Sequence, residues 1–593
     1  LDCCIFPKTG YPPTDPAEWE RIFSTLKDHG LNHMRFHSWC PPKAAFVAAD
    51  NMGFYLHVEG PSWANQGASL GDGRPIDDFI YSETRRILDE YGNHPSFVMY
   101  AYGNEPAGQH QQEFLGEFVT FWREQDPRRL YTSAAGWPMI PENDFHSSPA
   151  PRIQQWGQGL SSIINGQAPQ TMYDWGEFVL SQDIPVVSHE IGQWCVYPNF
   201  DEMSKYTGYL KPKNFEIFYD LLKRNHMDDQ AHDFLMASGK LQALCYKADI
   251  EAALRTPEFA GFQLLDIHDF PGQGTALVGI LDPFYESKPY INAEEWNQFC
   301  AVTVPLARME KRLYKTSENF ATQIEIAHFG ASPINNALVT WSIQKQDGTI
   351  WQSGQFESTI AIDNCQTIGD VNLSLAEIKA PSKLTLIVDV AGHGKNSWDF
   401  WVYPDEVELK THDILVTTEL SNEIIQKLLD GSTVLLNLNG KVREGKGAEV
   451  AIGFSSVFWN TAWTSDQPPH TLGILCDPQH PLFANFPTEY HSNWQWWDVI
   501  HSSQAMILDD LPPDLRPIIQ PIDTWFYARR LGLLFEANVG KGKIVVTSID
   551  FQNDLDTRLA SRQLYTGLLD YMRSDNFAPE QNLELAEIMS FYR

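Results

Sequence analysis

Two glutamates stand at the ends of apolar stretches that read as buried strands. Glu105 closes "SFVMYAYGNE" (96–105), directly after Asn104, and Glu190 closes "PVVSHE" (185–190). A strand needs neither an amide nor a carboxylate at its end for its own stability. Two carboxylates that meet in one site suit hydrolysis of a glycosidic bond, in which one protonates the leaving oxygen and the other attacks or stabilises the anomeric carbon. We interpret Glu105 and Glu190 as candidate catalytic residues.

The elements that must position the two glutamates form a regular pattern. Residues 1–305 alternate short apolar strands with helical segments, which predicts a parallel sheet. One helix is expected over 15–30, with Asp15 as its N-cap, Pro16 at its first position and Gly30 as its stop. Eight strand and helix units favour a closed (β/α)8 TIM barrel, in which the carboxyl ends of the strands converge on the active face. The expected strands cover 1–6, 31–37, 54–59, 96–105, 130–136, 152–157, 185–190 and 259–266.

A lone glutamate after a strand is usually a solvated loop charge. Here two such residues end what count as the fourth and seventh strands, and their separation of 85 residues (190 minus 105) leaves room for the elements between them. A pair on the strands that a two-carboxylate mechanism would use favours the catalytic interpretation.

Four stretches of this region resemble the catalytic barrel of glycoside hydrolase family 2, the β-galactosidase and β-glucuronidase family. They are "MRFHSWCPP" (34–42), "YAYGNEP" (100–106), "PVVSHEIGQW" (185–194) and "FAGFQLLDIHDFPGQG" (259–274). The Asn-Glu pair with a later strand-end Glu is shared by a whole clan of retaining barrel hydrolases. The resemblance implies a retaining, exo-acting glycoside hydrolase that removes a terminal sugar by double displacement.

The resemblance also implies roles for single residues. Glu105 would be the general acid/base and Glu190 the nucleophile, while Asn104 would hold the hydroxyl next to the anomeric centre. Arg35 and His37 match the family's second-strand Arg and His, and a cation beside Glu190 would keep its pKa low. A structural salt bridge is the alternative role for Arg35. The further residues expected to bind substrate are Glu59, Trp63, Tyr173, Trp194, Gln263, Asp266 and His268.

The sugar is predicted from the charges expected after the eighth strand. Asp266 and Asp269 would bring two carboxylates towards the site, and no Lys or Arg occurs between Phe259 and Glu286. A uronate would meet repulsion of roughly a few kcal/mol at an effective dielectric of ~20. The family's Asn-x-Lys signature for uronates is not evident, and its usual Trp after the eighth strand is missing. We expect a neutral hexose, galactose first, with a β-glucuronide or an arabinopyranoside as runners-up.

Beyond residue 305 the pattern changes twice. Residues 306–404 read as short strands separated by turn signals, which predicts a β-sandwich. Residues 405–593 predict a small open α/β domain that resembles the flavodoxin-like fold of class I glutamine amidotransferases. The Cys that amidotransferase chemistry needs on a tight turn is absent from "LLNLNGK" (435–441), and Cys476 lies outside any such turn. We expect a non-catalytic accessory domain, and "TEYHSNWQWWD" (488–498) is interpreted as packing or an interface.

Composition excludes other classes of function. The chain has 593 residues and a formal net charge of −33, which nucleic acid and an anionic membrane surface would repel. No apolar run approaches the ~20 residues that span a bilayer. The eight Cys include no C-x-x-C and no metal-finger spacing, and neither a metal nor a cofactor is expected. Aromatic residues make up 13% of the chain, with 19 Trp; sugar recognition and ordinary core packing both account for such a content.

The expected partner is an oligo- or polysaccharide, and the C-terminal domain is a possible homo-oligomer contact. A non-catalytic carbohydrate-binding or scaffold protein is the alternative class, but it would lose one of the two carboxylates. "LDCCIF" (1–6) reads as a strand entered at its first residue. We therefore expect sequence upstream, including the β-sandwich domains that precede the barrel in family 2. A periplasmic or extracellular location is favoured over a cytoplasmic one.

Overall fold

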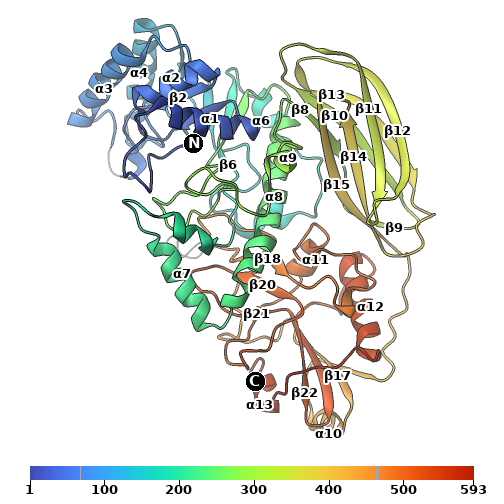
Figure 1. Cartoon of the computed structure of the whole chain (residues 1–593). Coiled ribbons are helices and arrows are strands. Elements are labelled where there is room, and N and C mark those ends of the chain that lie inside the picture. Colours follow the sequence, from blue (N-terminus) through green and yellow to red (C-terminus); the bar gives the residue numbers. More distant parts are fainter. Residues whose placement is uncertain (67–68, 461–466) are drawn as a thin grey trace.

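The computed structural model describes residues 1–66, 69–460 and 467–593. Three regions follow one another along the chain: an N-terminal α/β region (blue to green), a β-sandwich (yellow) and a C-terminal α/β region (orange to red) (Figure 1). The architecture therefore mixes α/β and β regions, in the order that the sequence predicts. The expected domain limits at 305 and 404 stay predictions.

The N-terminal region is built on parallel strands. Four strands pair in the order β1-β2-β3-β4 and three more in the order β5-β6-β7, and every pair is parallel. Most residues of these strands are buried, as expected for parallel strands whose two faces are covered. The strands are β1 (His33–Phe36), β2 (Tyr55–Glu59), β3 (Phe97–Ala101), β4 (Leu130–Thr132), β5 (His146–Ser148), β6 (Val186–Ile191) and β7 (Gly261–Leu264).

A closed eight-stranded barrel is not confirmed, because the parallel strands described form two separate sheets. Backbone hydrogen bonds connect the edges of these sheets. The amino group of Leu1 donates to the carbonyl of Leu264 at 3.2 Å, on the β7 side. The amide of Asp144 donates to the carbonyl of Tyr131 at 2.9 Å, between β4 and β5. The two sheets are therefore neighbours joined at their margins.

Two predicted strands differ from the structure. The first contributes only a bridge from Asp2 to Phe36. Residues 152–157 form bends and turns, and β5 lies just before them instead. Pro149 and Pro151 separate β5 from this segment, and proline has no N–H to give to a ladder. The prediction of a strand over 152–157 is wrong for this reason.

Helices connect the parallel strands, and α1 (Pro16–Asp28) follows its sequence signals closely. The Asp15 carboxylate accepts the amide of Ala17 at 3.0 Å, and Gly30 follows the helix with a φ of 72°. The predicted cap, first-turn proline and stop are therefore confirmed. The other helices of this region are α2 (Lys43–Met52), α3 (Pro75–Tyr91), α4 (Gln111–Gln125), α5 (Ile163–Gly166), α6 (Gly176–Leu180), α7 (Lys213–Arg224) and α9 (Ala293–Trp296).

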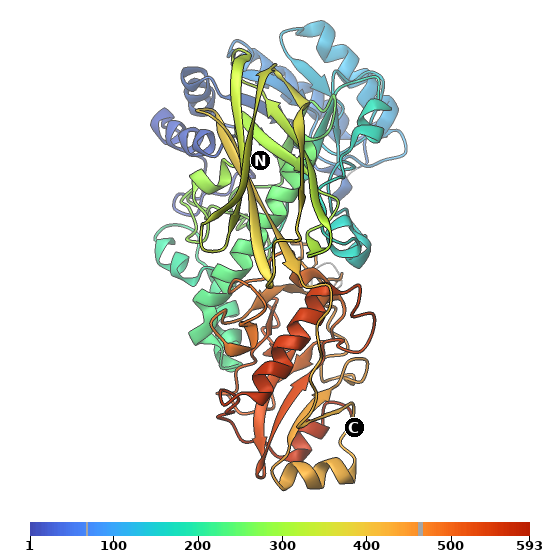
Figure 2. The same ribbon diagram turned by 90° about the vertical axis from the view of Figure 1, so that its right-hand side faces the viewer.

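The longest helix of the described residues, α8 (Ala231–Leu254), runs through the centre of the molecule from the N-terminal region to the C-terminal region (Figures 1 and 2). It buries the carboxylates of Asp249 and Glu251. Glu251 accepts from Trp398 Nε1 at 3.0 Å and from Asn396 Nδ2 at 2.8 Å, both in the sandwich. Since a buried carboxylate needs such partners, these bonds fix α8 against the sandwich.

The β-sandwich has one sheet in the order β13-β10-β8 and another in the order β12-β11-β14-β15-β9. Phe320 of the first sheet stacks on Phe400 of the second with ring centroids 4.2 Å apart, inside an apolar core. The expected sandwich is therefore present. Its strands are β8 (Thr303–Arg308), β9 (Leu313–Lys315), β10 (Asn319–His328), β11 (Ile334–Lys345), β12 (Ile350–Ile360), β13 (Asp363–Ser374), β14 (Ser382–Val390) and β15 (Gly394–Tyr403).

The C-terminal region contains a mixed sheet in the order β16-β17-β23-β22, in which the pair β22 and β23 is antiparallel. Its strands are β16 (Ile414–Thr417), β17 (Thr433–Asn437), β18 (Thr471–Leu475), β19 (Met506–Ile507), β20 (Gln520–Asp523), β21 (Leu531–Gly532), β22 (Leu534–Val539) and β23 (Gly542–Thr547). Its helices are α10 (Asn422–Leu429), α11 (Trp496–His501), α12 (Leu559–Arg573) and α13 (Leu585–Met589).

The amidotransferase resemblance of this region is not confirmed. Cys476 is buried, its Sγ donates to the carbonyl of Glu489 at 3.3 Å, and burial raises the pKa of its thiol. A thiol in that state is a poor nucleophile. Trp496 is fully buried, and Trp497 Nε1 donates to the carbonyl of Ile164 at 2.9 Å, so this stretch packs against the N-terminal region.

None of the helices formed by the described residues combines the length and the apolar character needed to cross a bilayer.

Replacement of Glu251 by Ala should destabilise the fold strongly. Lys247 and Arg255, which pair with this carboxylate at 2.6 and 3.3 Å, would be left as uncompensated buried cations. Loss of one partner of a buried ion pair costs about 3–5 kcal/mol. Thermal unfolding followed by circular dichroism should show a marked fall in Tm, whereas Glu124→Ala, at an exposed site on α4, should leave Tm nearly unchanged. Equal Tm values for the two variants would contradict this account of α8.

Candidate active site

β6 and the segment after β3 place the two candidate glutamates. Glu190 is the second-last residue of β6, and Glu105 lies shortly beyond the end of β3. Both have a positive φ, 37° for Glu105 and 53° for Glu190. A residue with a Cβ rarely adopts this conformation, which costs on the order of 1–3 kcal/mol and is concentrated at functional sites.

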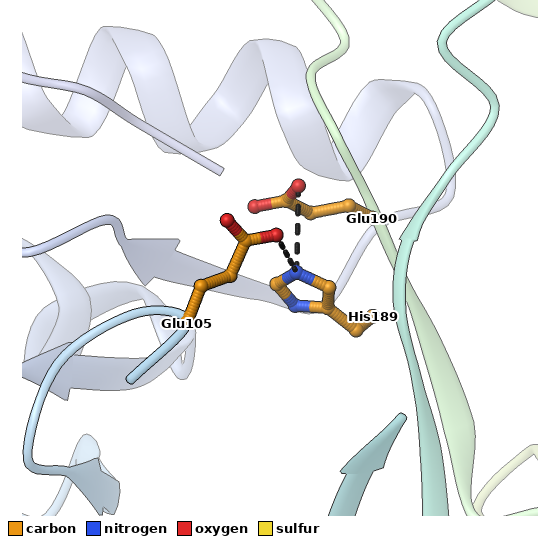
Figure 3. Close-up of side chains that lie close together, drawn as sticks. All are labelled: Glu105, His189 and Glu190. Atoms are coloured by element: carbon orange, nitrogen blue, oxygen red, sulfur yellow. Dashed lines mark ion pairs between the residues drawn. The ribbon is translucent and has the colours of Figure 1, made fainter. Parts of the chain in front are cut away.

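The two carboxylates converge beside the His189 ring (Figure 3). One oxygen of Glu105, one oxygen of Glu190 and one ring nitrogen of His189 all lie within 4.8 Å of one another. The side chain of Glu105 is 20% exposed and that of Glu190 is 10% exposed. A ligand can therefore reach both carboxylates, whereas the nearby Glu59 side chain, 0% exposed, is closed off.

Arg35, on β1, joins these residues. Its Nη2 pairs with Glu190 Oε1 at 2.7 Å and its Nε with Glu59 Oε1 at 2.9 Å, while Nη1 donates to His189 Nδ1 at 2.9 Å. Nη2 also lies 3.4 Å from Asn104 Oδ1. The Arg35 side chain is 1% exposed, and burial of a guanidinium is costly unless carboxylates compensate its charge. The five side chains therefore form one electrostatic unit.

The proton position on His189 follows from these contacts. Arginine has no acceptor atom, so His189 Nδ1 must accept from Arg35. The neutral ring then carries its proton on Nε2, which lies 3.4 Å from Glu190 Oε2 and 3.8 Å from Glu105 Oε1. His189 thus presents an N–H edge to both carboxylates.

Arg35 also sets the charge state of Glu190. Burial alone would raise the pKa of Glu190, but His189, Arg35 and His37 outweigh it, and the pKa lies well below its usual range. Burial lowers the pKa of His189 and lowers that of His37 to about 4, so both rings are neutral near pH 7. Arg35 is therefore the cation that keeps Glu190 ionised, as the sequence predicted for a cation at this position.

Asn104 and Trp63 complete the surroundings of the pair. Trp63 Nε1 donates to Glu105 Oε2 at 2.9 Å and fixes the orientation of that carboxyl group. Asn104 is 1% exposed, and its Nδ2 has no hydrogen-bond partner among the described residues. A buried N–H₂ without a partner is unusual in a folded protein and marks Asn104 as a candidate donor to a ligand hydroxyl. Asn104, Trp63, Arg35 and His37 are therefore brought together with the glutamates.

Gly136, after β4, has no side chain, and this makes room for Glu105 and His189. Its φ is 100°, and a Cβ there would lie 3.3 Å from both Glu105 Cγ and His189 Nε2. A larger residue would meet both backbone strain and a close contact with the site.

Five other predicted residues are not brought to the glutamates. Gln263 binds His57 Nδ1 at 3.0 Å inside the parallel strands. Trp194 is fully buried and bridges Val457 of the C-terminal region. Asp266 and His268 lie 3.4 Å apart, and Tyr173 lies beneath the Arg255 guanidinium. None of the contacts described for these five residues reaches Glu105 or Glu190.

Two residues at the site were missed from the sequence. His189 directly precedes Glu190, so its position beside a predicted catalytic residue was a usable signal. Arg152 lies in a segment predicted as a strand, and its Nη1 donates to the carbonyl of Glu190 at 3.3 Å. This contact crosses 38 residues of chain and carries no local sequence signal.

The triad of Glu105, His189 and Glu190 has the donor types of a metal site. However, Arg35 already places a permanent positive charge 2.7 Å from Glu190. A divalent cation bound there would meet this charge at short range, which is unfavourable. The geometry therefore fits a paired carboxylate site better than a metal centre.

Two family models match parts of the chain outside the N-terminal region. The first, Domain of unknown function (DUF8488), matches residues 318–404, and the second, Domain of unknown function (DUF8487), matches residues 415–593. Their descriptions assign no activity to these regions.

The named similar proteins are glycoside hydrolases. A protein of Formosa agariphila named "Putative beta-glucuronidase" is 27% identical over 115 residues, which is 19% of this chain and 11% of that protein. The beta-D-mannosidase of Dictyoglomus thermophilum gives a TM-score of 0.47 at 12% identity, over 67% of this chain and 49% of that one. The FMN-binding beta-glucuronidase of Facaelibacterium prausnitzii L2-6 gives a TM-score of 0.35 at 13% identity, over 66% of this chain and 54% of that one. The chain thus spans about half the length of the solved structures and a ninth of the curated relative.

Glu59 should make stability depend on pH. Burial raises the pKa of Glu59 from 4.5 to about 7, against the opposing charge of Arg35. The folded state then binds the proton more tightly than the unfolded state, so stability falls as pH rises from 4.5 to about 7. Glu59→Gln should reduce this pH-dependent loss in the free energy of unfolding by about 3 kcal/mol at most. Thermal unfolding between pH 4.5 and 7.5 checks this; an unchanged slope, equal to that of the exposed-site variant Glu113→Gln, would contradict it.

Proposed function

We propose that the protein is a retaining, exo-acting glycoside hydrolase in which Glu190 is the nucleophile and Glu105 the general acid/base. The observation that carries the proposal is the approach of the two carboxylates, with oxygens within 4.8 Å, while Arg35 pairs with Glu190. Carboxyl groups stand about 5–5.5 Å apart in retaining enzymes and about 6.5–9.5 Å apart in inverting ones. The short approach of the two carboxylates supports retention over inversion, which needs room for an attacking water.

Each residue then has a defined task. Glu190, kept ionised by Arg35, attacks the anomeric carbon and forms a glycosyl ester, while Glu105 gives its proton to the departing oxygen. In the second step Glu105 takes a proton from water, which attacks the same carbon and releases Glu190. The free Nδ2 of Asn104 is positioned to donate to a substrate hydroxyl, and the Nε2–H of His189 stabilises negative charge shared between the two carboxylates.

The structure weakens the charge repulsion from which a neutral sugar was predicted. Asp269 pairs with Lys288 at 2.7 Å, both buried, so its charge is compensated locally. Burial raises the pKa of Asp266 to about 7. In addition, Arg152 places a second guanidinium beside Glu190. A β-galactoside therefore stays one candidate substrate, and a β-glucuronide is an equal one.

The stereochemical course tests the mechanism. With a nitrophenyl glycoside that the protein cleaves, proton NMR should detect the product first with the anomeric configuration of the substrate. A panel of β-galactoside, β-glucuronide, β-mannoside and α-arabinopyranoside covers the candidate sugars. If the first product of any cleaved glycoside has the inverted configuration, the assignment of Glu190 as nucleophile is wrong.

Variants of the two glutamates should behave differently. Glu190→Gln should lower kcat by roughly 10³-fold or more on every substrate, because nothing replaces the nucleophile. Glu105→Ala should lose roughly 10²–10⁴-fold on an alkyl glycoside, but much less on a dinitrophenyl glycoside, whose aglycone departs without protonation.

Glu113→Gln, on the exposed face of α4, is the matched control and should keep full activity. Treatment with a chelator should leave the wild-type rate unchanged. Equal losses for the two glycosides in Glu105→Ala would contradict its role as acid, and loss of activity on chelation, restored by a divalent cation, would favour metal hydrolysis.

A further inference from the structure

A segment of the C-terminal region, residues 453–460, packs directly behind the end of β6. The amide of Cys195 donates to the carbonyl of Ser456 at 3.1 Å, and the amide of Phe458 donates to the carbonyl of Gln193 at 3.1 Å. Gln193 Nε2 in turn donates to the carbonyl of Glu190 at 2.8 Å. The C-terminal region is therefore connected to the proposed nucleophile by two successive hydrogen bonds.

Arg152 lies between this segment and Glu190. Its guanidinium sits 5.2 Å from the ring centre of Trp459, and its Nη1 donates to the carbonyl of Glu190 at 3.3 Å. Its Nε is buried without a hydrogen-bond partner, and no carboxylate of the described residues lies within the 4.0 Å of an ion pair. Burial lowers the pKa of Arg152, while the charges of Glu190, Asp249 and Glu105 oppose this shift without pairing directly with the guanidinium.

The buried Arg530 makes more hydrogen bonds than Arg152, although its Nε likewise has no hydrogen-bond partner. Arg530 donates to four backbone carbonyls, among them those of Pro512, Pro513 and Leu511 at 3.0, 2.8 and 2.7 Å. Arg152 uses one donor for such a contact. Because an unpaired guanidinium in a partly buried position is costly, its remaining donors are suited to an anion that comes from outside the chain.

The position of Arg152 is held by α8. Asp249 Oδ1 accepts the amide of Ile153 at 3.2 Å, and Asp249 Oδ2 accepts the amide of Gly192 at 3.0 Å. One buried carboxylate thus connects the residue after Arg152 to the end of β6. Arg152 and Glu190 are therefore fixed relative to each other before any ligand binds.

Trp156 packs against Trp459 and is exposed at the surface. Its ring centre is 5.5 Å from that of Trp459, and the side chain is 58% exposed. An exposed aromatic face and a guanidinium that both contact Trp459 offer the two contacts that a charged sugar uses, stacking for the ring and paired donors for the anion.

We propose that Arg152 and Trp156, both packed on the buried Trp459 of the C-terminal region, form a saccharide subsite that receives an anionic sugar unit beside the catalytic pair. The anion is a carboxylate or a sulfate ester, since both present the oxygens that a guanidinium binds. The placement of this subsite beside the glutamates rests on the proposed glycosidase function; its binding chemistry does not.

Isothermal titration with the full chain tests the subsite without any need for turnover. The probes are methyl 1-thio-β-D-glucoside, its C6 carboxylate and its 6-sulfate, together with the three galactose counterparts, because thioglycosides resist hydrolysis. At least one anionic probe should bind about tenfold tighter than its neutral parent, and added salt should reduce this difference. The carboxylate and sulfate arms identify which anion is preferred.

Variants separate binding from a structural role. Arg152→Gln should remove the anion preference and leave the affinity for neutral probes within about threefold, whereas Arg152→Lys should restore part of it. Trp156→Ala should weaken charged and neutral probes alike, since stacking does not depend on the charge. The matched control is Arg86→Gln, on the exposed face of α3, which should change nothing.

Three outcomes would overturn the subsite: neutral and anionic probes bind equally, no probe binds, or Arg152→Gln weakens all probes by the same factor. The last result would mean that Arg152 only supports the backbone of Glu190. An anion preference in a protein that cleaves none of the nitrophenyl glycosides would uphold the subsite and contradict the proposed hydrolase instead.

Discussion

The site depends on one guanidinium that is shared between several acceptors. Arg35 leaves β1 and meets Glu59 from β2, Asn104 after β3, and His189 and Glu190 from β6. Neither the cation nor these anions could be buried alone at a tolerable cost, so each one fixes the position of the others. The two parallel sheets are thereby held in the relative position that brings Glu105 and Glu190 within reach of one substrate atom.

The support around this unit comes largely from outside the strands. Asp249 on α8 holds the backbone on both sides of the site, and Gly136 leaves room where a Cβ would touch Glu105 and His189. The two glutamates themselves adopt positive φ values that the surrounding contacts must maintain. The reactive groups are therefore few, while the contacts that hold them are spread over distant parts of the chain.

The sequence predicted those parts of the structure that depend on local pattern. Glu105 and Glu190 stand out because apolar strands end on them, and the cap, first proline and stop of α1 lie within one segment. Contacts across the chain were not accessible. Lys288, which compensates Asp269, lies two residues beyond Glu286, outside the stretch from 259 to 286 that has no cation. The contact of Arg152 with Glu190 depends on bends after two prolines. The prediction of a strand over 152–157 failed because Pro149 and Pro151 separate this segment from β5, and the amide of Ile153 donates to Asp249 of α8 instead of to a ladder.

The packing of residues 453–460 against the end of β6 limits how the regions of this chain can be exchanged. Regions joined by a flexible linker can be exchanged between genes, since each keeps its function when the other is replaced. Here Cys195 and Gln193, close to Glu190, find their backbone partners in a segment that arrives more than 250 residues later. A recombinant that supplied a different C-terminal region would leave these groups unpaired next to the reactive carboxylates. Exchange of the C-terminal region alone would therefore disturb the backbone next to Glu190.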